Sequence, residues 1–381
     1  MTAEKSFNLP KDFGYQLGLI GFTRLSNIVR LIHFSIGIHP RYGLRLLLVI
    51  ISSLITLPLR LWETIACGRQ IAQIEIDRSP VFIIGYWRSG TTYLHNLMTQ
   101  DKTFGYLSMY QAMVPDCSLV GQSWLKPLLS KIVPLKRPMD NMIWPVDAPQ
   151  EEEFPLAKMT PNSFYINFLF PRKTLYLFKK YVLMEGATQR AIDEFKQKYC
   201  KLLQIATLHA NGKPLILKNP VNTARVRLLR EMFPQAKFIH IHRSPYDVFA
   251  SCQHLHHTLS KLTTLQTIDS ENADETVLSL YEQMMGRFFL DRESIGDRHL
   301  VEVSFEDLEK DPLTELSRIY KTLDLEGFDR AEPAFKAYIA SQKSYKKNNF
   351  HLAVEDCKRV EQRWAFAFSS LNYPLQDRSD C

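Results

Sequence analysis

One stretch of the sequence decides the fold: residues 81–98 read VFIIGYWRSGTTYLHNLM. The first four residues form a short apolar run rich in β-branched side chains, which is typical of a buried strand. Gly85 and Gly90 then enclose a loop, and the apolar residues of 93–98 recur at helical spacing. The sequence therefore predicts a strand, a glycine-flanked loop and a helix, in that order.

The loop between the two glycines is suited to binding an anion. Glycine adopts backbone angles that other residues resist, so the loop can wrap an anion and turn N–H groups toward it. The start of the following helix adds unpaired N–H donors and a partial positive charge. Arg88 supplies a cation, and Thr91 and Thr92 supply hydroxyl groups. We therefore predict a phosphate-sized anion site at residues 85–92.

The loop differs from that of a nucleoside triphosphatase. Its glycine spacing matches a Walker A motif, but Thr91 stands where that motif has lysine. Such an enzyme also needs an aspartate at the end of a later strand to hold Mg²⁺, whereas the candidate strands at 215–217 and 238–242 are followed by Lys218 and Arg243. The site is therefore expected to neutralise anions with protein cations and to use no metal. A P-loop nucleotide kinase or nucleoside triphosphatase is the alternative interpretation.

A second anion site is predicted at the carboxyl edge of the same sheet. Ligands of doubly wound sheets bind at that edge, and Lys218 lies at the end of the strand at 215–217. Arg243 follows the strand at 237–242, and Ser251 lies about two turns into the next helix. A bent strand–turn–helix can bring this guanidinium and this hydroxyl to one phosphate.

Together these motifs resemble the sulfotransferase superfamily, whose sulfuryl donor is 3′-phosphoadenosine 5′-phosphosulfate (PAPS). The Arg-Ser-Gly-Thr-Thr loop at 88–92 is similar to that of bacterial sulfotransferases and tyrosylprotein sulfotransferases. Segments 218–220, 233–238 and 243–251 resemble the family's following block, which ends in the 3′-phosphate site. The resemblance covers residues 78–371 and implies an α/β fold with a P-loop-like parallel sheet flanked by helices.

The resemblance implies a role for each matching residue. Arg88 would neutralise charge on the transferring sulfuryl group, and Lys218 would assist the transition state, so that in-line transfer needs no metal. The implied donor-binding residues, besides Arg88, are Ser89, Gly90, Thr91 and Thr92 at the 5′-phosphate, Arg243 and Ser251 at the 3′-phosphate, and Ser344, Lys346 and Lys347 in a basic loop over the nucleotide. A solvated basic loop is the alternative for the last three.

Transfer to an alcohol or phenol also needs a general base. The tyrosylprotein branch carries a glutamate shortly after the loop helix, but residues 104–110 contain no carboxylate. The acidic run at 151–153 resembles a motif of the bacterial branch. Because helical spacing places Glu151 and Glu153 beside apolar side chains, we expect these two, rather than Glu152, to turn inward and act as candidate bases. The alternatives are a solvated helix start, or a base among His95, His254, His256 and His257.

The acceptor side is expected in residues 104–180, which are rich in aromatic residues and punctuated by prolines. An irregular aromatic insertion between the first two strands is a place where an acceptor pocket can form, although aromatic residues also build ordinary cores. The apolar character of this segment points to a hydrophobic or lipid-like acceptor that carries a hydroxyl group.

We predict two parts: a basic, apolar helical extension at 1–74 and a single α/β domain at 75–381. The last third of the chain indicates helices at 273–294, 313–323, 334–342 and 354–371, with one more strand at 299–303.

The extension is predicted to contact a membrane surface peripherally through residues 17–62. Residues 1–70 carry a net charge of +5, out of +7 for the whole chain, and mixed basic and apolar residues suit an interfacial helix. The uncharged run at 46–59 would span about 21 Å as a helix, less than the hydrocarbon core of a bilayer. Pro58, near the end of this run, also argues against a continuous membrane span. Two helices packed on the main domain are the alternative.

The composition of the 381-residue chain, with 45 % hydrophobic and 23 % charged residues, excludes collagen-like and disordered classes. The polar, mixed-charge residues 1–15 do not read as a cleavable signal peptide, and a dense disulfide framework is not expected in so long a chain, so we predict a cytoplasmic protein. Nucleic acid is not expected as a partner, because the positive charge lies among apolar residues. A non-catalytic, membrane-associated nucleotide-binding module is the third hypothesis.

Overall fold

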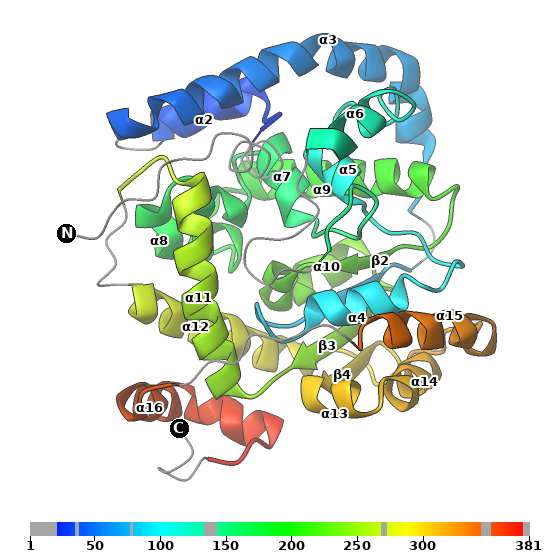
Figure 1. Cartoon of the computed structure of the whole chain (residues 1–381), viewed down its shortest axis with the longest axis vertical. Coiled ribbons are helices and arrows are strands. Elements are labelled where there is room, and N and C mark those ends of the chain that lie inside the picture. The colour runs from blue at the N-terminus through cyan, green and yellow to red at the C-terminus, as the bar shows by residue number, and fades with distance from the viewer. Residues whose placement is uncertain are drawn as a thin grey trace.

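The centre of the fold is a parallel four-stranded sheet (Figure 1). The structure is a computed structural model that describes residues 21–34, 38–76, 79–132, 143–267, 273–343 and 352–375. Within these residues the strands lie in the order β2–β1–β3–β4. Their bounds are β1 Val81–Ile84, β2 Ile216–Lys218, β3 Lys237–His242 and β4 Leu300–Ser304.

The sequence located these strands closely, because each is a short run of β-branched or aromatic residues. The limits of β1 and β3 agree with the prediction, and β4 begins one residue later than expected. Lys218, expected at the edge of the second strand, is the last residue of β2 and pairs in register with Ile83 of β1. The carboxyl ends of β1 and β2 are therefore adjacent, as the two predicted anion sites require.

Helices cover both faces of the sheet, which confirms the predicted α/β class. Along β1, Val81 and Ile83 pack against one layer, while Phe82 and Ile84 pack against the other. The first layer contains α4 Thr91–Met98, α13 Phe305–Lys310, α14 Pro312–Thr322 and α15 Phe328–Ser341. The second contains α9 Gln189–His209, α10 Val226–Met232, α11 Pro245–Thr263, α12 Ala273–Arg292 and α16 Val354–Leu371.

The helices of the last third follow the prediction with local differences. α16 has the predicted limits, and α12 and α14 differ by one or two residues at their ends. α15 begins six residues earlier than expected, since Gly327, with φ of 94°, forms its N-cap. The sequence missed α13, a single short segment whose start is capped by the hydroxyl of Ser304.

The insertion between β1 and β2 is built from short segments, as its prolines suggest. Its α-helices are α5 Met109–Met113, α6 Leu125–Ile132, α7 Glu153–Met159 and α8 Thr174–Tyr181, followed by α9, and its 3₁₀ turns are η2 Phe164–Phe168 and η3 Pro171–Lys173. Another 3₁₀ turn, η4 Pro220–Ala224, links β2 to α10. The insertion lies between the sheet and the N-terminal helices (Figure 1).

Two N-terminal helices lie over the insertion at the end of the molecule far from α16 (Figure 1). They are α2 Leu25–Phe34 and, after the turn η1 Pro40–Tyr42, the 31-residue α3 Gly43–Gln73. Helix α3 continues through Pro58. Among the described residues, the helix at 40–73 is the one long and apolar enough to cross a membrane, judged by length and composition alone.

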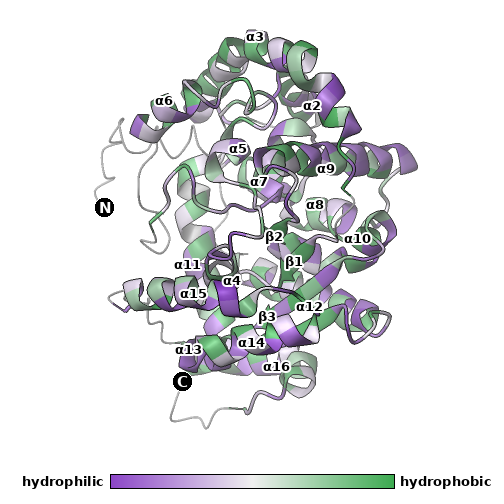
Figure 2. Ribbon diagram, turned by 90° about the vertical axis from the view of Figure 1, so that its right-hand side faces the viewer, coloured by the Kyte–Doolittle hydropathy of each residue, from purple (hydrophilic) through white to green (hydrophobic). Residues whose placement is uncertain are grey.

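Helix α3 places its polar and apolar side chains in an unusual way. Its buried face carries four polar residues, Ser52, Ser53, Thr56 and Glu63, together with Val49 and Ile71. Its outer face exposes a row of large apolar side chains, namely Leu44, Leu47, Ile51, Leu54, Ile55, Leu57, Leu61, Trp62 and Ile65. Figure 2 shows much of this helix in the hydrophobic colour at the outer end of the molecule. A helix that packs on a soluble protein normally shows the opposite pattern.

Candidate functional site

The loop between β1 and α4 is packed so tightly that its glycines are required. Gly85 and Gly90 have φ of 145° and 94°. A Cβ would collide with the carbonyl oxygen of Ile241 at Gly85 and with the ring of Phe305 at Gly90. Arg88 also has a left-handed backbone, with φ of 70°, a strain that clusters at functional sites. Since Gly90 caps α4 without a side chain, the first N–H groups of this helix are left for an anion.

Two of the predicted anion-binding residues touch each other. Arg88 donates its Nε–H to Oγ of Ser251 on α11 at 2.8 Å. The next residue on that helix, Cys252, donates its thiol to the carbonyl oxygen of Trp87 at 3.6 Å. The sequence assigned Arg88 and Ser251 to different ends of the donor, and the fold brings both onto one surface of the loop.

Arg243 lies beside the loop through a shared aromatic ring. It follows β3, and its guanidinium stands 4.9 Å from the ring centroid of Phe305, the residue that also packs against Gly90. Its Nη2 lies 3.0 Å from Oδ2 of Asp247. Arg243 and the loop therefore meet at the same edge of the sheet, as predicted for parallel strands.

Lys218 joins the loop to the acidic run. Its side chain is 2 % exposed, and its Nζ donates to Oγ1 of Thr92 at 3.4 Å and to Oε1 of Glu151. A buried ammonium of this kind requires an anionic partner, and Glu151 supplies it. The structure thus places a predicted cation, a predicted loop hydroxyl and a predicted base in direct contact.

Tyr165 completes a chain of hydrogen bonds across the site. Its phenol donates to Oε2 of Glu151 and accepts a hydrogen bond from Nε1 of Trp87 at 3.0 Å. Burial raises the pKa of Tyr165 well above its usual value. The connected groups run from Trp87 through Tyr165, Glu151 and Lys218 to Thr92, so the chain of bonds starts and ends in the loop. The sequence marked Tyr165 only as one aromatic residue of the insertion.

Glu153 is enclosed by donors on both oxygens. Arg225 approaches Oε2 at 2.7 Å with Nη1, and Asn219 donates to the same oxygen at 3.0 Å. Oε1 accepts from the hydroxyl of Ser163 and the backbone N–H of Phe164, each at 2.8 Å. Although burial opposes ionisation, the arginine and the other donors hold the pKa of Glu153 below its usual value. These contacts favour a structural anion. The sequence did not single out Arg225, which lies 72 residues from Glu153.

Glu152 is also buried, so the expectation that only its two neighbours turn inward is wrong. The prediction assumed a helix that includes residues 151–153, whereas α7 begins at Glu153 and Glu152 is its N-cap residue. Neither carboxyl oxygen of Glu152 has a hydrogen-bond partner among the described residues. Burial, against the weaker influence of nearby backbone N–H groups and of the Lys218 ammonium, raises the pKa of Glu152 to about 8, so this carboxyl is protonated near neutral pH.

The histidines proposed as alternative bases differ in position. His95 on α4 is buried, and its Nε2 lies 3.3 Å from the carbonyl oxygen of Ile216. Burial lowers its pKa to about 3, and burial also lowers the pKa of His256 on α11 to about 4. Both are neutral at pH 7, and His256 lines the pocket described next.

A pocket opens beside Trp87 and Tyr165, and we call it the loop pocket. Its walls include Trp87, Tyr165, Phe168, Cys252, Leu255 and His256. It combines an aromatic residue of the loop, the phenol that holds Glu151, and the first turns of α11 after Ser251. The loop pocket is therefore next to the predicted cations and the predicted base.

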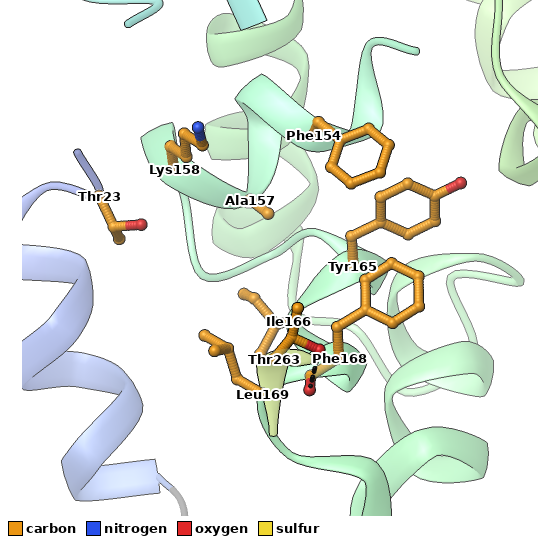
Figure 3. A pocket seen from close by; sticks show the side chains of 9 residues that line it. All are labelled: Thr23, Phe154, Ala157, Lys158, Tyr165, Ile166, Phe168, Leu169 and Thr263. Carbon is orange, nitrogen blue, oxygen red and sulfur yellow. Dashed lines mark hydrogen bonds between the residues drawn. The ribbon is translucent and has the colours of Figure 1, made fainter. Parts of the chain in front are cut away.

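A second pocket lies on the other side of Tyr165, and we call it the distal pocket (Figure 3). Its walls include Phe154, Ala157, Tyr165, Ile166, Phe168 and Leu169. Figure 3 shows the rings of Phe154, Tyr165 and Phe168 along one side, with Lys158 and Thr23 on the opposite side. Tyr165 and Phe168 line both pockets. The predicted aromatic insertion therefore forms concave surfaces beside the site.

Some of the predicted site residues cannot be placed. Ser344, Lys346 and Lys347 lie outside the described residues. Ser89 and Thr91 are buried in the loop. Within the described part of the chain, no three or more His, Cys, Asp or Glu side chains are grouped so that they could hold a metal ion.

Comparisons with known proteins identify the family of the chain. The family model described as "Sulfotransferase family" matches residues 80–330. The omega-hydroxy-beta-dihydromenaquinone-9 sulfotransferase Stf3 of Mycobacterium bovis is 32 % identical over 335 residues, which are 88 % of this chain and 85 % of that protein.

Solved structures of sulfotransferases share the fold. STF9 from Mycobacterium avium superposes with a TM-score of 0.68 at 19 % identity, covering 98 % of this chain and 99 % of that one. STF1 from Mycobacterium tuberculosis superposes with a TM-score of 0.62 at 19 % identity, covering 95 % and 94 %. The family match extends over more than half of the chain and includes the loop, Lys218, Arg243 and Ser251, and the chain therefore belongs to the sulfotransferase family of enzymes.

Proposed function

We propose that this enzyme transfers a sulfuryl group from PAPS to the hydroxyl group of a hydrophobic, lipid-like acceptor. The observation that carries the proposal is the hydrogen-bonded chain from Trp87 through Tyr165, Glu151 and Lys218 to Thr92, beside an apolar pocket. This chain of hydrogen bonds links the anion-binding loop to the carboxylate of Glu151, at the point where an acceptor can lie. Neither the kinase hypothesis nor the binding-module hypothesis explains this arrangement.

The donor fits the loop edge of the sheet. The glycine positions leave no room for side chains, and the uncapped start of α4 offers N–H groups to the 5′-phosphate, together with Ser89, Thr91 and Thr92. Arg243 and Ser251 would hold the 3′-phosphate, as the family resemblance implies. Bound PAPS supplies an activated sulfuryl group, and Arg88 would balance the negative charge around it.

The acceptor proton would leave through Tyr165. A hydroxyl held in the loop pocket can pass its proton to the Tyr165 oxygen while the Tyr165 proton moves to Oε2 of Glu151, so one proton leaves the acceptor and one arrives on the carboxylate. Protonation of Glu151 weakens its attraction to Lys218, which frees that ammonium to stabilise developing charge on the transferring group. Glu151 is then the general base, and Glu153 holds the surrounding backbone in place.

The acceptor class follows from the pockets, from helix α3 and from a relative. Both pockets have mainly apolar walls. α3 exposes a continuous apolar face flanked by basic residues such as Arg41 and Arg69, which suits a membrane surface. The similar enzyme Stf3 is named for a menaquinone derivative that carries a hydroxyl group. We therefore propose a cytoplasmic enzyme that contacts membranes peripherally through residues 17–62 and takes its acceptor from them.

The first test is calorimetric binding of adenosine 3′,5′-bisphosphate and of ATP, each with and without magnesium, to the wild type and to Arg243→Ala. We expect the wild type to bind the bisphosphate in preference to ATP. Loss of a bidentate, charge-assisted contact should weaken binding at least about tenfold in the variant. Arg227→Ala, on the exposed side of α10, is the matched control and should bind like the wild type. Preference for ATP with magnesium would overturn the proposal in favour of a kinase.

A further inference from the structure

Arg243 stands between two residues that are both bonded to the same pair of side chains. His242 ends β3 and Ser244 precedes α11, so the three residues are consecutive. The phenol oxygen of Tyr373, in the segment after α16, lies 2.9 Å from Nδ1 of His242. The same phenol donates its proton to Oε2 of Glu306 at 2.8 Å, and Oε1 of Glu306 accepts the backbone N–H of Ser244 at 3.0 Å. We call Tyr373 and Glu306 the C-terminal clamp.

The hydrogen bonds of the C-terminal clamp run in one direction. Burial lowers the pKa of His242 to about 4, so its ring is neutral near pH 7 and carries a single N–H. Burial and the nearby carboxylate of Glu306 raise the pKa of Tyr373 above its usual value, so the phenol keeps the proton that it donates. The phenol oxygen is therefore left to accept, and the proton of His242 belongs on Nδ1. Each group in the chain then has the role that its neighbour requires.

Tyr373 reaches the clamp because α16 ends in a turn beside the start of α11. The C-cap residue of α16, Asn372, has a left-handed backbone with φ of 58°, which ends the helix and turns the chain. The ring of Tyr373 then meets that of His242 edge to face, with 5.5 Å between centroids. In the first turn of α11, the phenol of Tyr246 donates to Oε1 of Glu361 on α16 at 2.7 Å. Packed helices therefore set the position of Tyr373.

Glu306 is placed by the residue before it. Phe305 begins α13, is buried, and packs its ring against Gly90 of the anion-binding loop. The guanidinium of Arg243 lies over the same ring, 4.9 Å from its centroid, an arrangement that holds a cation against an aromatic face. Two successive residues thus act on Arg243: the ring of Phe305 supports its side chain, and the carboxylate of Glu306 holds the backbone that follows it.

We propose that the C-terminal clamp positions Arg243 for the 3′-phosphate of the donor. The inference rests on the proposed function, in which Arg243 binds that phosphate, and adds the residues that orient this arginine. Tyr373 and Glu306 are positioning residues, because they act on the nucleotide through Arg243 and its two neighbours. An arginine held in place before the nucleotide arrives loses less conformational freedom on binding, and the phosphate contact gains affinity accordingly.

Two nucleotides that differ by one phosphate test the proposal. Adenosine 3′,5′-bisphosphate carries the 3′-phosphate and adenosine 5′-monophosphate lacks it, so calorimetry with both measures the contribution of that group. Tyr373→Phe removes one hydroxyl without a change of charge. It should weaken bisphosphate binding about three- to tenfold, the usual worth of one hydrogen bond, and leave monophosphate binding unchanged. Tyr320→Phe is the matched control: it removes a phenol–carboxylate bond of 2.7 Å, to Asp101, from α14, and should bind both nucleotides like the wild type.

A double-mutant cycle shows whether Tyr373 acts through Arg243. In an Arg243→Ala background, Tyr373→Phe should not weaken bisphosphate binding further, because the side chain that it positions is gone. Unchanged bisphosphate binding in the single variant Tyr373→Phe, equal weakening of both nucleotides, or the same loss with and without Arg243 would each overturn the clamp and leave the proposed donor site intact. A wild type that binds both nucleotides equally well would instead overturn the donor site itself.

Discussion

The acidic cluster at residues 151–153 buries charge, whereas helix α3 exposes apolar side chains. In the cluster each ionised group has a partner within the chain: Glu153 meets Arg225, and Glu151 meets Lys218. On α3 the outer apolar side chains have no such cover in the described part of the structure. The usual placement of residues is reversed in both regions. The buried charges of the acidic cluster are paired by other residues of the chain. The exposed apolar side chains of α3 call for an apolar surface outside the protein.

The largest effect should come from breaking the internal pairing of Glu153. Arg225→Met would leave this carboxylate buried and unpaired, at a cost of about 3–5 kcal/mol of unfolding free energy. Urea unfolding measures the change. Adding Glu153→Gln to Arg225→Met should restore part of the loss. Arg227→Met, on the exposed side of α10, whose N-cap residue is Arg225, should change little. If Arg225→Met lowers the unfolding free energy by less than about 1 kcal/mol, the Arg225–Glu153 pair does not stabilise the fold in this way.

The second-largest effect is expected on catalysis, and it distinguishes the role of Glu151 from the structural role of Glu153. Glu151→Gln should lower kcat by about 10²–10⁴, because a general base is removed while its shape is kept. Bisphosphate affinity should stay near the wild-type value, whereas the urea midpoint should fall, because the buried Lys218 loses its anionic partner. Tyr165→Phe should also lower kcat, since the proton path through the phenol is lost. A Glu151→Gln enzyme with near-normal kcat would exclude this carboxylate as the base.

Glu152 tests whether a buried carboxyl without a partner stays neutral. Its pKa is raised from 4.5 in the unfolded chain to about 8 in the fold, so the folded state binds the extra proton between these values. Stability from this group is therefore full below pH 4.5 and falls by about 1.4 kcal/mol per pH unit as pH rises toward 8. Glu152→Gln should remove this slope. The comparison of urea midpoints at pH 5.5 and 7.5, variant against wild type, isolates Glu152 from the other titrating groups.

The smallest effect on stability is expected for substitutions on the outer face of α3, because the proposed partner of this face is a membrane and not another part of the chain. Ile55→Ser with Ile65→Ser should change unfolding free energy by less than about 0.5 kcal/mol per site, yet weaken binding to anionic phospholipid vesicles at least about tenfold. Flotation with vesicles measures this. Leu290→Ser removes an equally exposed side chain from α12 and should leave vesicle binding unchanged. Equal loss in both variants would show that the α3 face has no special role.

The sequence predicted the donor side of the molecule better than the acceptor side, for a physical reason. The loop, β1 and β3 are local patterns in which strand, glycine and helix signals lie within a few residues of one another. Lys218 and Ser251 could be placed because parallel strands end at one edge. The partners of the acidic cluster are long-range: Lys218 lies 67 residues from Glu151, and Arg225 lies 72 residues from Glu153. No periodicity encodes such pairs.

The errors also have identifiable causes. Glu152 was expected to face outward because helical spacing was applied to residues that precede α7. The hydroxyl of Thr223 accepts the backbone N–H of Gly85 at 2.8 Å, a contact that forms only once β1 and β2 are adjacent. Proline generally disfavours a helix interior, yet α3 passes through Pro58 on its exposed side. In each case tertiary structure overrode a local preference.

Pro58 also limits how deep α3 can sit in a bilayer. Proline has no N–H, so the carbonyl oxygen of Leu54, one turn earlier, loses its usual helical partner. In hydrocarbon an unpaired carbonyl costs several kcal/mol, whereas among lipid headgroups water can solvate it. With Leu54 on the outer face, the proposed membrane contact would be most stable with the helix lying flat at headgroup depth and its leucines directed toward the acyl chains. The enzyme would then float at the lipid–water boundary, where a lipid hydroxyl and a soluble nucleotide are both within reach.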